Sequence, residues 1–197
     1  MKPKFATAMS NLTPFVAHGA INYQELKQLG LRPDSVLDFS ANSNPYGPHP
    51  AVVEAVRAAV SAPNLARYPD RDCLELRAAL AAVEGLTPDY LMAGNGANEL
   101  IHLAALALAT PGSRHLIIGP TFGEYAQAIR LLGGQTVEYW PARPDLRGEA
   151  EAVAAMIEQV QPEGIWLCHP NNPTGQQWSA AELACFVMGK RLNKLGG

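Results

Sequence analysis

From residue 90 onward, short apolar runs alternate with longer stretches in which apolar residues recur every three or four positions. The short runs predict strands, and the longer stretches predict helices that turn one face toward a core. The predicted strands are Tyr90–Met92, His115–Ile118, Gln135–Tyr139 and Gly164–Cys168. The predicted helices cover residues 95–109, 122–132, 149–159 and 180–190, and Ser179 is the expected cap of the last one.

The chain before residue 90 lacks this alternation. Turn-forming residues crowd positions 40–48, and the first 48 residues are expected to be largely irregular. Three helices are nevertheless predicted there. They are Asn22–Leu29 ended by Gly30, Pro50–Ala59 with a proline in its first turn, and a helix that Asp72 caps and that continues to Ala82.

Strands that alternate with helices through short loops are typical of an α/β fold with a parallel sheet and helices on both faces. Such sheets bind ligands at the carboxyl ends of their strands. The pattern therefore predicts a site formed by residues 93–98, 119–122 and 169–175, which follow the first, second and fourth predicted strands.

Each of these segments has a functional and a structural interpretation. Gly96, Ala97 and Asn98 open a helix, where free N–H groups attract phosphate, but the same residues also make an ordinary tight turn. Phe122 is placed either to stack on a flat ligand or to pack into the core. Asn172 lies between two prolines, in a turn that either aims its side chain or simply reverses the chain. His169 has no companion at ligand spacing, so no metal site is expected.

Composition narrows the class of protein. The formal net charge is −3 and no basic stripe is present, so nucleic acid is not an expected partner. The three cysteines are scattered without a CxxC pair, which indicates a reducing compartment rather than a disulfide framework. No apolar run is long enough to cross a bilayer. A cytoplasmic protein without a membrane partner is expected.

Five short motifs occur in order along the chain. They are Asn42-Ser43-Asn44-Pro45-Tyr46-Gly47, Arg67-Tyr68-Pro69, Gly96-Ala97-Asn98-Glu99, Pro120-Thr121-Phe122 and Asn172-Pro173-Thr174-Gly175. Their order and spacing resemble the fold-type-I pyridoxal-phosphate-dependent aminotransferases of class I and II, up to about Phe186. Within that superfamily the chain is similar to threonine-phosphate decarboxylases of the cobalamin pathway, through His18-Gly19 and residues 37–45, and to histidinol-phosphate aminotransferases.

The resemblance implies a three-layer α/β/α domain with a seven-stranded sheet in the order 3-2-4-5-6-7-1, of which this chain has four strands. Residues 1–48 would form an N-terminal arm and substrate-side loop, and residues 49–188 part of the large cofactor-binding domain. Residues 189–197 resemble nothing in the family and are expected to be a truncated or out-of-frame end. The first strand would then have no neighbour, and two sheet edges would be exposed.

The resemblance also implies roles for individual residues. The backbone of Gly96, Ala97 and Asn98 would hold the phosphate of pyridoxal 5'-phosphate, Phe122 would stack on its ring, and Asn172 would hydrogen-bond its phenolic oxygen. The remaining roles go to Tyr68, reaching the cofactor of the other subunit in a homodimer, and to His18 and Asn42, facing a small amino acid or phosphorylated amine substrate.

Pyridoxal chemistry also needs a lysine that forms a Schiff base with the cofactor and a carboxylate at the ring nitrogen. In the family both lie beyond the Asn172 turn. None of the five lysines here stands at a predicted strand end, so no catalytic residue is assigned and the chain alone is expected to be inactive.

The expected function is therefore that of a transaminase or decarboxylase fragment, most similar to threonine-phosphate decarboxylase. The alternatives are a fragment of a histidinol-phosphate transaminase and a non-catalytic remnant that binds cofactor or a partner. An unrelated nucleotide binder is disfavoured because Gly94-Asn95-Gly96-Ala97-Asn98 lacks the GxGxxG spacing.

Overall fold

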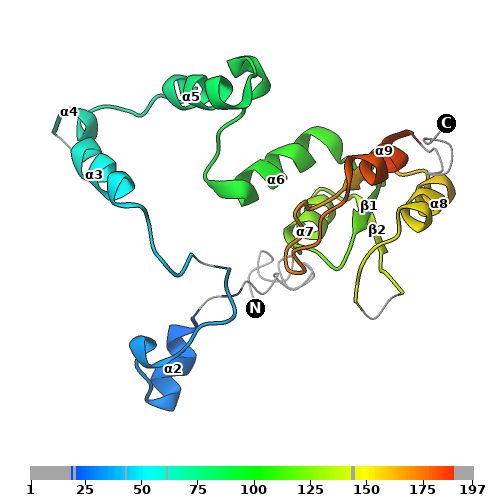
Figure 1. Ribbon diagram of the computed structural model, residues 1–197, viewed down its shortest axis with the longest axis horizontal. Helices are drawn as coiled ribbons and strands as arrows, with labels where there is room; N and C mark the ends of the chain where they lie inside the picture. The colour runs from blue at the N-terminus through cyan, green and yellow to red at the C-terminus, as the bar shows by residue number, and fades with distance from the viewer. Residues whose placement is uncertain (1–18, 20, 43, 61, 143–144, 189–197) are drawn as a thin grey trace, which may run out of the picture. The chain divides into compact units, whose positions relative to one another are not determined.

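The computed structural model describes residues 19, 21–42, 44–60, 62–142 and 145–188. They pack as two units that meet in sequence between Ala93 and Gly94 (Figure 1). We call residues 94–188 the sheet unit and residues 19–93 the helical unit, and each is described by itself. The boundary between the two units lies inside residues 49–188, which the resemblance assigned to one large domain. The domain boundaries expected from the sequence stay a prediction.

The sheet unit is built on three parallel strands. They are β1 (Arg114–Ile118), β2 (Gln135–Tyr139) and β3 (Gly164–Trp166), in the spatial order β2-β1-β3. Leu116 at the centre of β1 lies opposite Val137 of β2 and Ile165 of β3. Three of the four predicted strands are confirmed. Their order is the 3-2-4 order that the resemblance implied.

Helices cover both faces of this sheet, as apolar side chains alternate along β1. Leu116 and Ile118 pack on the side of α8 (Ala150–Val160) and α9 (Ala180–Met188). Ile117 packs on the opposite side, against α6 (Gly96–Leu108) and α7 (Glu124–Leu131). The expected three-layer α/β/α architecture is confirmed (Figure 1).

The central strand also carries a buried polar network. His115 is fully buried, and its Nδ1 accepts a hydrogen bond from Trp166 Nε1 at 3.2 Å. Because an indole nitrogen can only donate, the imidazole proton lies on Nε2, 3.0 Å from Ser113 Oγ. Ser113 in turn donates to the carbonyl of Thr110 at 2.7 Å. The network fixes one tautomer of His115 and ties β1 to β3.

The last helix begins with a reciprocal cap. Ser179 Oγ accepts from the backbone N–H of Glu182, while the N–H and hydroxyl of Ser179 each donate to Glu182 Oε2 at 2.7 Å. These bonds, with the backbone N–H first, hold the pKa of Glu182 below its ordinary value. The cap predicted at Ser179 is confirmed as a capping box.

The predicted strand at Tyr90–Met92 is wrong. Residues Pro88–Tyr90 form a short 3-10 helix, η2, and residues 91–93 are in no strand. Three apolar residues do not specify a strand unless a neighbouring strand pairs with them, and none of the described residues does so.

The helical unit contains α2 (Tyr23–Leu29), α3 (Pro50–Ala59), α4 (Ala62–Leu65), α5 (Leu74–Glu84) and the 3-10 turns η1 (Pro33–Ser35) and η2. Helices α2, α3 and α5 were predicted, and α4 was not. Asn22 caps α2, and Gly30 ends it with a φ of 67°. Asp72 is not the cap of α5. Cys73 is the residue before the helix and makes no side-chain cap bond, while the Asp70 carboxylate accepts from the N–H of Leu74 at 2.7 Å.

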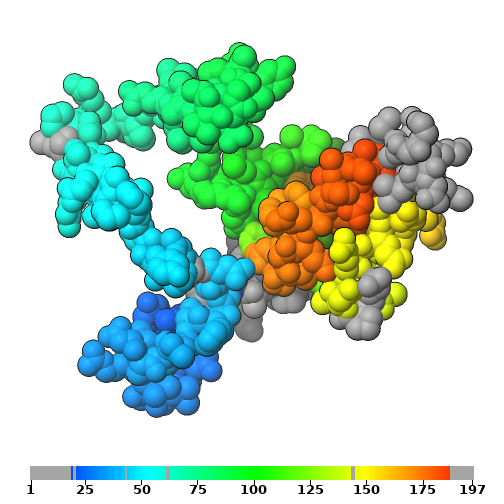
Figure 2. Space-filling model, viewed as in Figure 1, coloured from blue at the N-terminus to red at the C-terminus, as the bar shows by residue number. Residues whose placement is uncertain are grey.

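Little of the helical unit is buried. Leu26 and Ala81 are the buried apolar residues among those described there. The helices α3 and α5 are cyan and green in Figure 2. Each exposes apolar side chains, namely Val52 and Val56 on α3 and Leu74, Leu76, Leu80 and Val83 on α5. No helix in the described part of the chain is long and apolar enough to cross a membrane.

Candidate functional site

The candidate site lies at the carboxyl edge of the parallel sheet. Residues 119–122 follow β1 and residues 167–175 follow β3, and β1 and β3 are hydrogen-bonded neighbours. Helix α6, which begins at Gly96, packs against α7, the helix that follows Phe122. The edge therefore gathers the loops that follow β1 and β3, and α6 belongs to the same packed unit.

The start of α6 offers backbone donors. The first N–H groups of a helix have no partner within it, and here they belong to Gly96, Ala97 and Asn98. The N–H of Gly96 instead donates to the carbonyl of Gly94 at 2.9 Å, so the donors that point out of the turn are those of Ala97 and Asn98. All three residues are exposed, and Gly96 has a φ of 80°, which favours glycine. The backbone and side-chain N–H groups of Asn95 both donate to Glu99 Oε2, so this carboxylate closes the turn just before the helix.

Phe122 is backed by an aromatic stack. Its half-buried ring meets Tyr125 edge to face, with centroids 6.1 Å apart. Tyr125 in turn lies on Trp166 at 5.7 Å. Burial first, and then the neighbouring Cys168 thiol, raise the pKa of Tyr125 well above its ordinary value, so the phenol stays neutral. Tyr125 thus supports one side of the Phe122 ring, and part of that ring stays accessible.

A second contact joins α6 to α7 close to Phe122. His102 Nε2 of α6 lies 3.3 Å from Glu124 Oε2, and the Glu124 side chain is almost fully buried. The pair links the helix that carries the free N–H groups to the helix that begins after Phe122.

The turn after β3 contains two adjacent asparagines that behave differently. Asn172 is exposed, and its backbone N–H lies 3.4 Å from Cys168 Sγ. The side chain of Asn171 points back to the loop after β1, where it bonds to Pro120 and Thr121. The peptide bonds Gly119-Pro120, His169-Pro170 and Asn172-Pro173 are cis.

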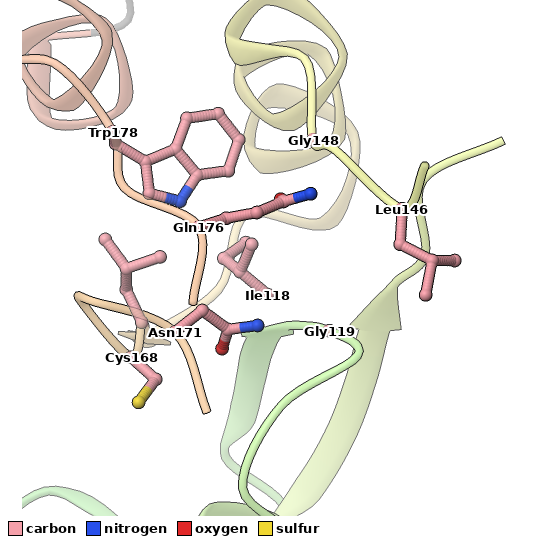
Figure 3. Close-up of a pocket in the computed structure, with 9 residues that line it drawn as sticks. Ile118, Gly119, Leu146, Gly148, Cys168, Asn171, Gln176 and Trp178 are labelled. Carbon is pink, nitrogen blue, oxygen red and sulfur yellow. The ribbon is translucent and has the colours of Figure 1, made fainter. Parts of the chain in front are cut away.

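A small pocket beside this turn was not predicted (Figure 3). Ile118, Gly119, Cys168, Asn171, Gln176 and Trp178 contribute to its lining. Ile118 belongs to the apolar cluster on the α8 and α9 side, and Trp178 packs against that cluster. Phe122 stacks with Tyr125 on the other side of the sheet, so this pocket is not the place where Phe122 would meet a ligand.

The other predicted site residues lie elsewhere in the chain. Tyr68 is fully exposed and Asn42 is also exposed, both in the helical unit. His18 lies outside the described residues. Of the lysines, the structure describes Lys27, an exposed residue of α2. In the sheet unit, hydrogen bonds bring the loop that holds Phe122 next to the turn that holds Asn172. The functional roles of these residues, and of those in the helical unit, stay predictions.

The chain is similar to proteins of known family. Residues 34–190 match the family model described as aminotransferase class I and II. A histidinol-phosphate aminotransferase of Sphingopyxis alaskensis is 37% identical across 96% of this chain and 50% of its own length. The chloroplastic histidinol-phosphate aminotransferase of Nicotiana tabacum is 38% identical across 75% of this chain and 35% of its own length. The chain spans half or less of the length of these relatives.

Solved structures show the same fold. Histidinol-phosphate aminotransferase from Sinorhizobium meliloti, in complex with pyridoxal-5'-phosphate, matches with a TM-score of 0.73 and 22% identity, over 97% of this chain and 48% of that one. A decarboxylase from Sulfurospirillum multivorans matches with a TM-score of 0.67 and 22% identity, over 94% of this chain and 48% of that one. With a family match over residues 34–190, the chain belongs to the aminotransferase class I and II family.

Proposed function

We propose that this chain is part of a pyridoxal-phosphate-dependent transaminase that acts on histidinol phosphate or a closely related phosphorylated amine. The observation that carries the proposal is the hydrogen-bonded pairing of the loop after β1, which holds Phe122, with the turn after β3, which holds Asn172, in a unit that also contains the start of α6. The names of the relatives favour this transaminase over the threonine-phosphate decarboxylase expected from the sequence.

The residues of the sheet unit fit the parts of the cofactor. The N–H groups of Ala97 and Asn98 would bind its phosphate, since a helix N-terminus favours a dianion, and Gly96 would join them by exchanging its bond to Gly94 for one to the phosphate. Phe122 would cover one face of the ring, and Asn172 would donate to its phenolic oxygen. When bound, the cofactor supplies an electron sink for chemistry at the α-carbon of an amine substrate.

The chain alone is proposed to hold the cofactor without a covalent bond and without turnover. The one lysine that the structure describes, Lys27, lies in α2 and at no strand end. Borohydride reduction with one equivalent of added pyridoxal phosphate should therefore label no single lysine in preference to the other amines. Selective one-to-one labelling of one lysine would contradict this part of the proposal.

A second copy of the chain is the proposed partner. Tyr68 is fully exposed, and α3 and α5 each expose apolar side chains that a second copy would cover. Tyr68 would reach the cofactor of the other subunit, and Asn42 and His18 would face the substrate. Sedimentation velocity should show a dimer, and a monomer at all concentrations would contradict this assignment.

The proposed location is the cytoplasm. Cys73, Cys168 and Cys185, all in the described part of the chain, form no disulfide, as expected in a reducing compartment. Cell fractionation tests the location, and recovery only from an organelle or membrane fraction would contradict it.

The phosphate assignment is tested by placing a charge at the start of α6. Ala97→Glu adds a carboxylate at an exposed first-turn position, where it stabilises the helix but repels a phosphate. Binding of pyridoxal phosphate, followed by fluorescence titration, should weaken about tenfold or more, equivalent to about 1.4 kcal/mol.

Ala97→Gln is the matched control, because it has the same length and no charge. It should bind within about twofold of the unchanged protein, a difference well below 1 kcal/mol. Equal affinities for Ala97→Glu and Ala97→Gln would place the phosphate elsewhere.

A further inference from the structure

Asn171 joins the two loops that carry the proposed ligand contacts. Its Nδ2 donates to the carbonyl of Pro120 at 2.8 Å, and its Oδ1 accepts from Thr121 Oγ1 at 2.8 Å. These are bonds between the loop after β1 and the turn after β3, which lie about 50 positions apart in the sequence.

The same side chain is also held within its own turn. Asn171 Nδ2 donates a second bond, to Thr174 Oγ1 at 2.7 Å. The backbone N–H of Asn171 donates to Gln176, and its carbonyl accepts from Gly175. Both amide hydrogens and the amide oxygen are therefore used, which leaves the side chain one orientation.

The residues next to these bonds are the ones expected to face the ligand. Thr121 directly precedes Phe122, and Asn171 directly precedes Asn172. The Asn171 bonds thus fix the separation between the ring of Phe122 and the turn of Asn172. Neither bond involves α6, whose N–H groups would hold the phosphate.

We propose that Asn171 is a positioning residue that sets Phe122 and Asn172 for the ring of the cofactor, while the phosphate is held independently by α6. This inference rests on the proposed function. It assigns Asn171 a role that differs from that of its neighbour, since Asn171 acts through other residues and touches no ligand itself.

Asparagine is required because one group must donate twice and accept once. In Asn171→Asp the carboxylate still accepts from Thr121, but it cannot donate to Pro120 and instead faces that carbonyl. Thr121→Val is a milder change, because it keeps the shape of the side chain and removes only the hydroxyl that donates to Asn171.

The test compares two probes on the full chain. Pyridoxine 5'-phosphate carries ring and phosphate but no aldehyde, and inorganic phosphate carries the anion alone. By NMR titration, Asn171→Asp should weaken pyridoxine phosphate about tenfold and Thr121→Val about threefold, while both bind inorganic phosphate within about twofold of the unchanged protein. A thermal melt of each variant checks that it is folded.

The outcomes separate the two claims. An equal loss of both probes would show a general structural defect and overturn the positioning role, as would unchanged pyridoxine phosphate affinity in both variants. If Asn171→Asp does not fold, Thr121→Val decides by the same comparison. If the unchanged protein binds pyridoxine phosphate no better than inorganic phosphate, the proposed function fails, and the inference about Asn171 fails with it.

Discussion

Replacing Gly164 by alanine is expected to lower the free energy of unfolding by about 3 kcal/mol, from overpacking and a disturbed buried hydrogen bond. A Cβ at this position would lie 2.5 Å from His115 Nδ1 and 3.0 Å from His115 Cε1. The imidazole cannot move away without losing its bond from Trp166 or its contact with Ser113. Urea denaturation measures the change.

A double variant controls for the cause. In a His115→Ala background the added methyl group meets no ring, so Gly164→Ala should cost about 1 kcal/mol or less there. The same cost in both backgrounds would show that the clash with His115 is not responsible.

Leu116→Ala is expected to destabilise the protein by about 3 to 4 kcal/mol, as deletion of a fully buried leucine leaves a cavity. Leu116 has no exposed surface and lies in the central strand, against the α8 and α9 side of the core. The midpoint of urea denaturation should fall without a large change in slope.

Leu106→Ala is the matched control in the same unit. Leu106 lies on α6 and is 62% exposed, so the same deletion should cost about 0.5 kcal/mol or less. Equal losses for the two variants would contradict the placement of the core.

The sheet was predictable because β1, β2 and β3 carry their own pattern. β1 and β3 contain short apolar runs, β2 alternates Val137 and Tyr139 with polar residues, and the helices between them have one apolar face. Tyr90–Met92 has the same local composition, but a strand also needs a partner, and pairing is not written in three residues. The sequence also did not show whether Asp70 or Asp72 would accept from the first N–H of α5. The path of the turn before the helix places the Asp70 carboxylate there.

Within the site, the sequence indicated the two loops but not which asparagine turns inward. Asn171 and Asn172 are chemically identical neighbours, and only Pro120 and Thr121, far away in sequence, decide between them. The signal in the sequence was Thr121, a hydroxyl-bearing residue just after another predicted strand, which is a possible hydrogen-bond partner for one of the two asparagines. The hydrogen bond between His115 and Trp166 could not be predicted either, because it depends on two strands that are distant in sequence lying side by side.

The most direct test of the account is a site-resolved titration of the backbone amides. Pyridoxine 5'-phosphate should shift the 15N–1H resonances of Ala97 and Asn98 and those of Gly119, Thr121, Phe122, Asn171 and Asn172. Pyridoxine without phosphate should leave Ala97 and Asn98 unmoved. Shifts at the start of α6 with both compounds, or with neither, would contradict the assignment of this helix end as the phosphate site.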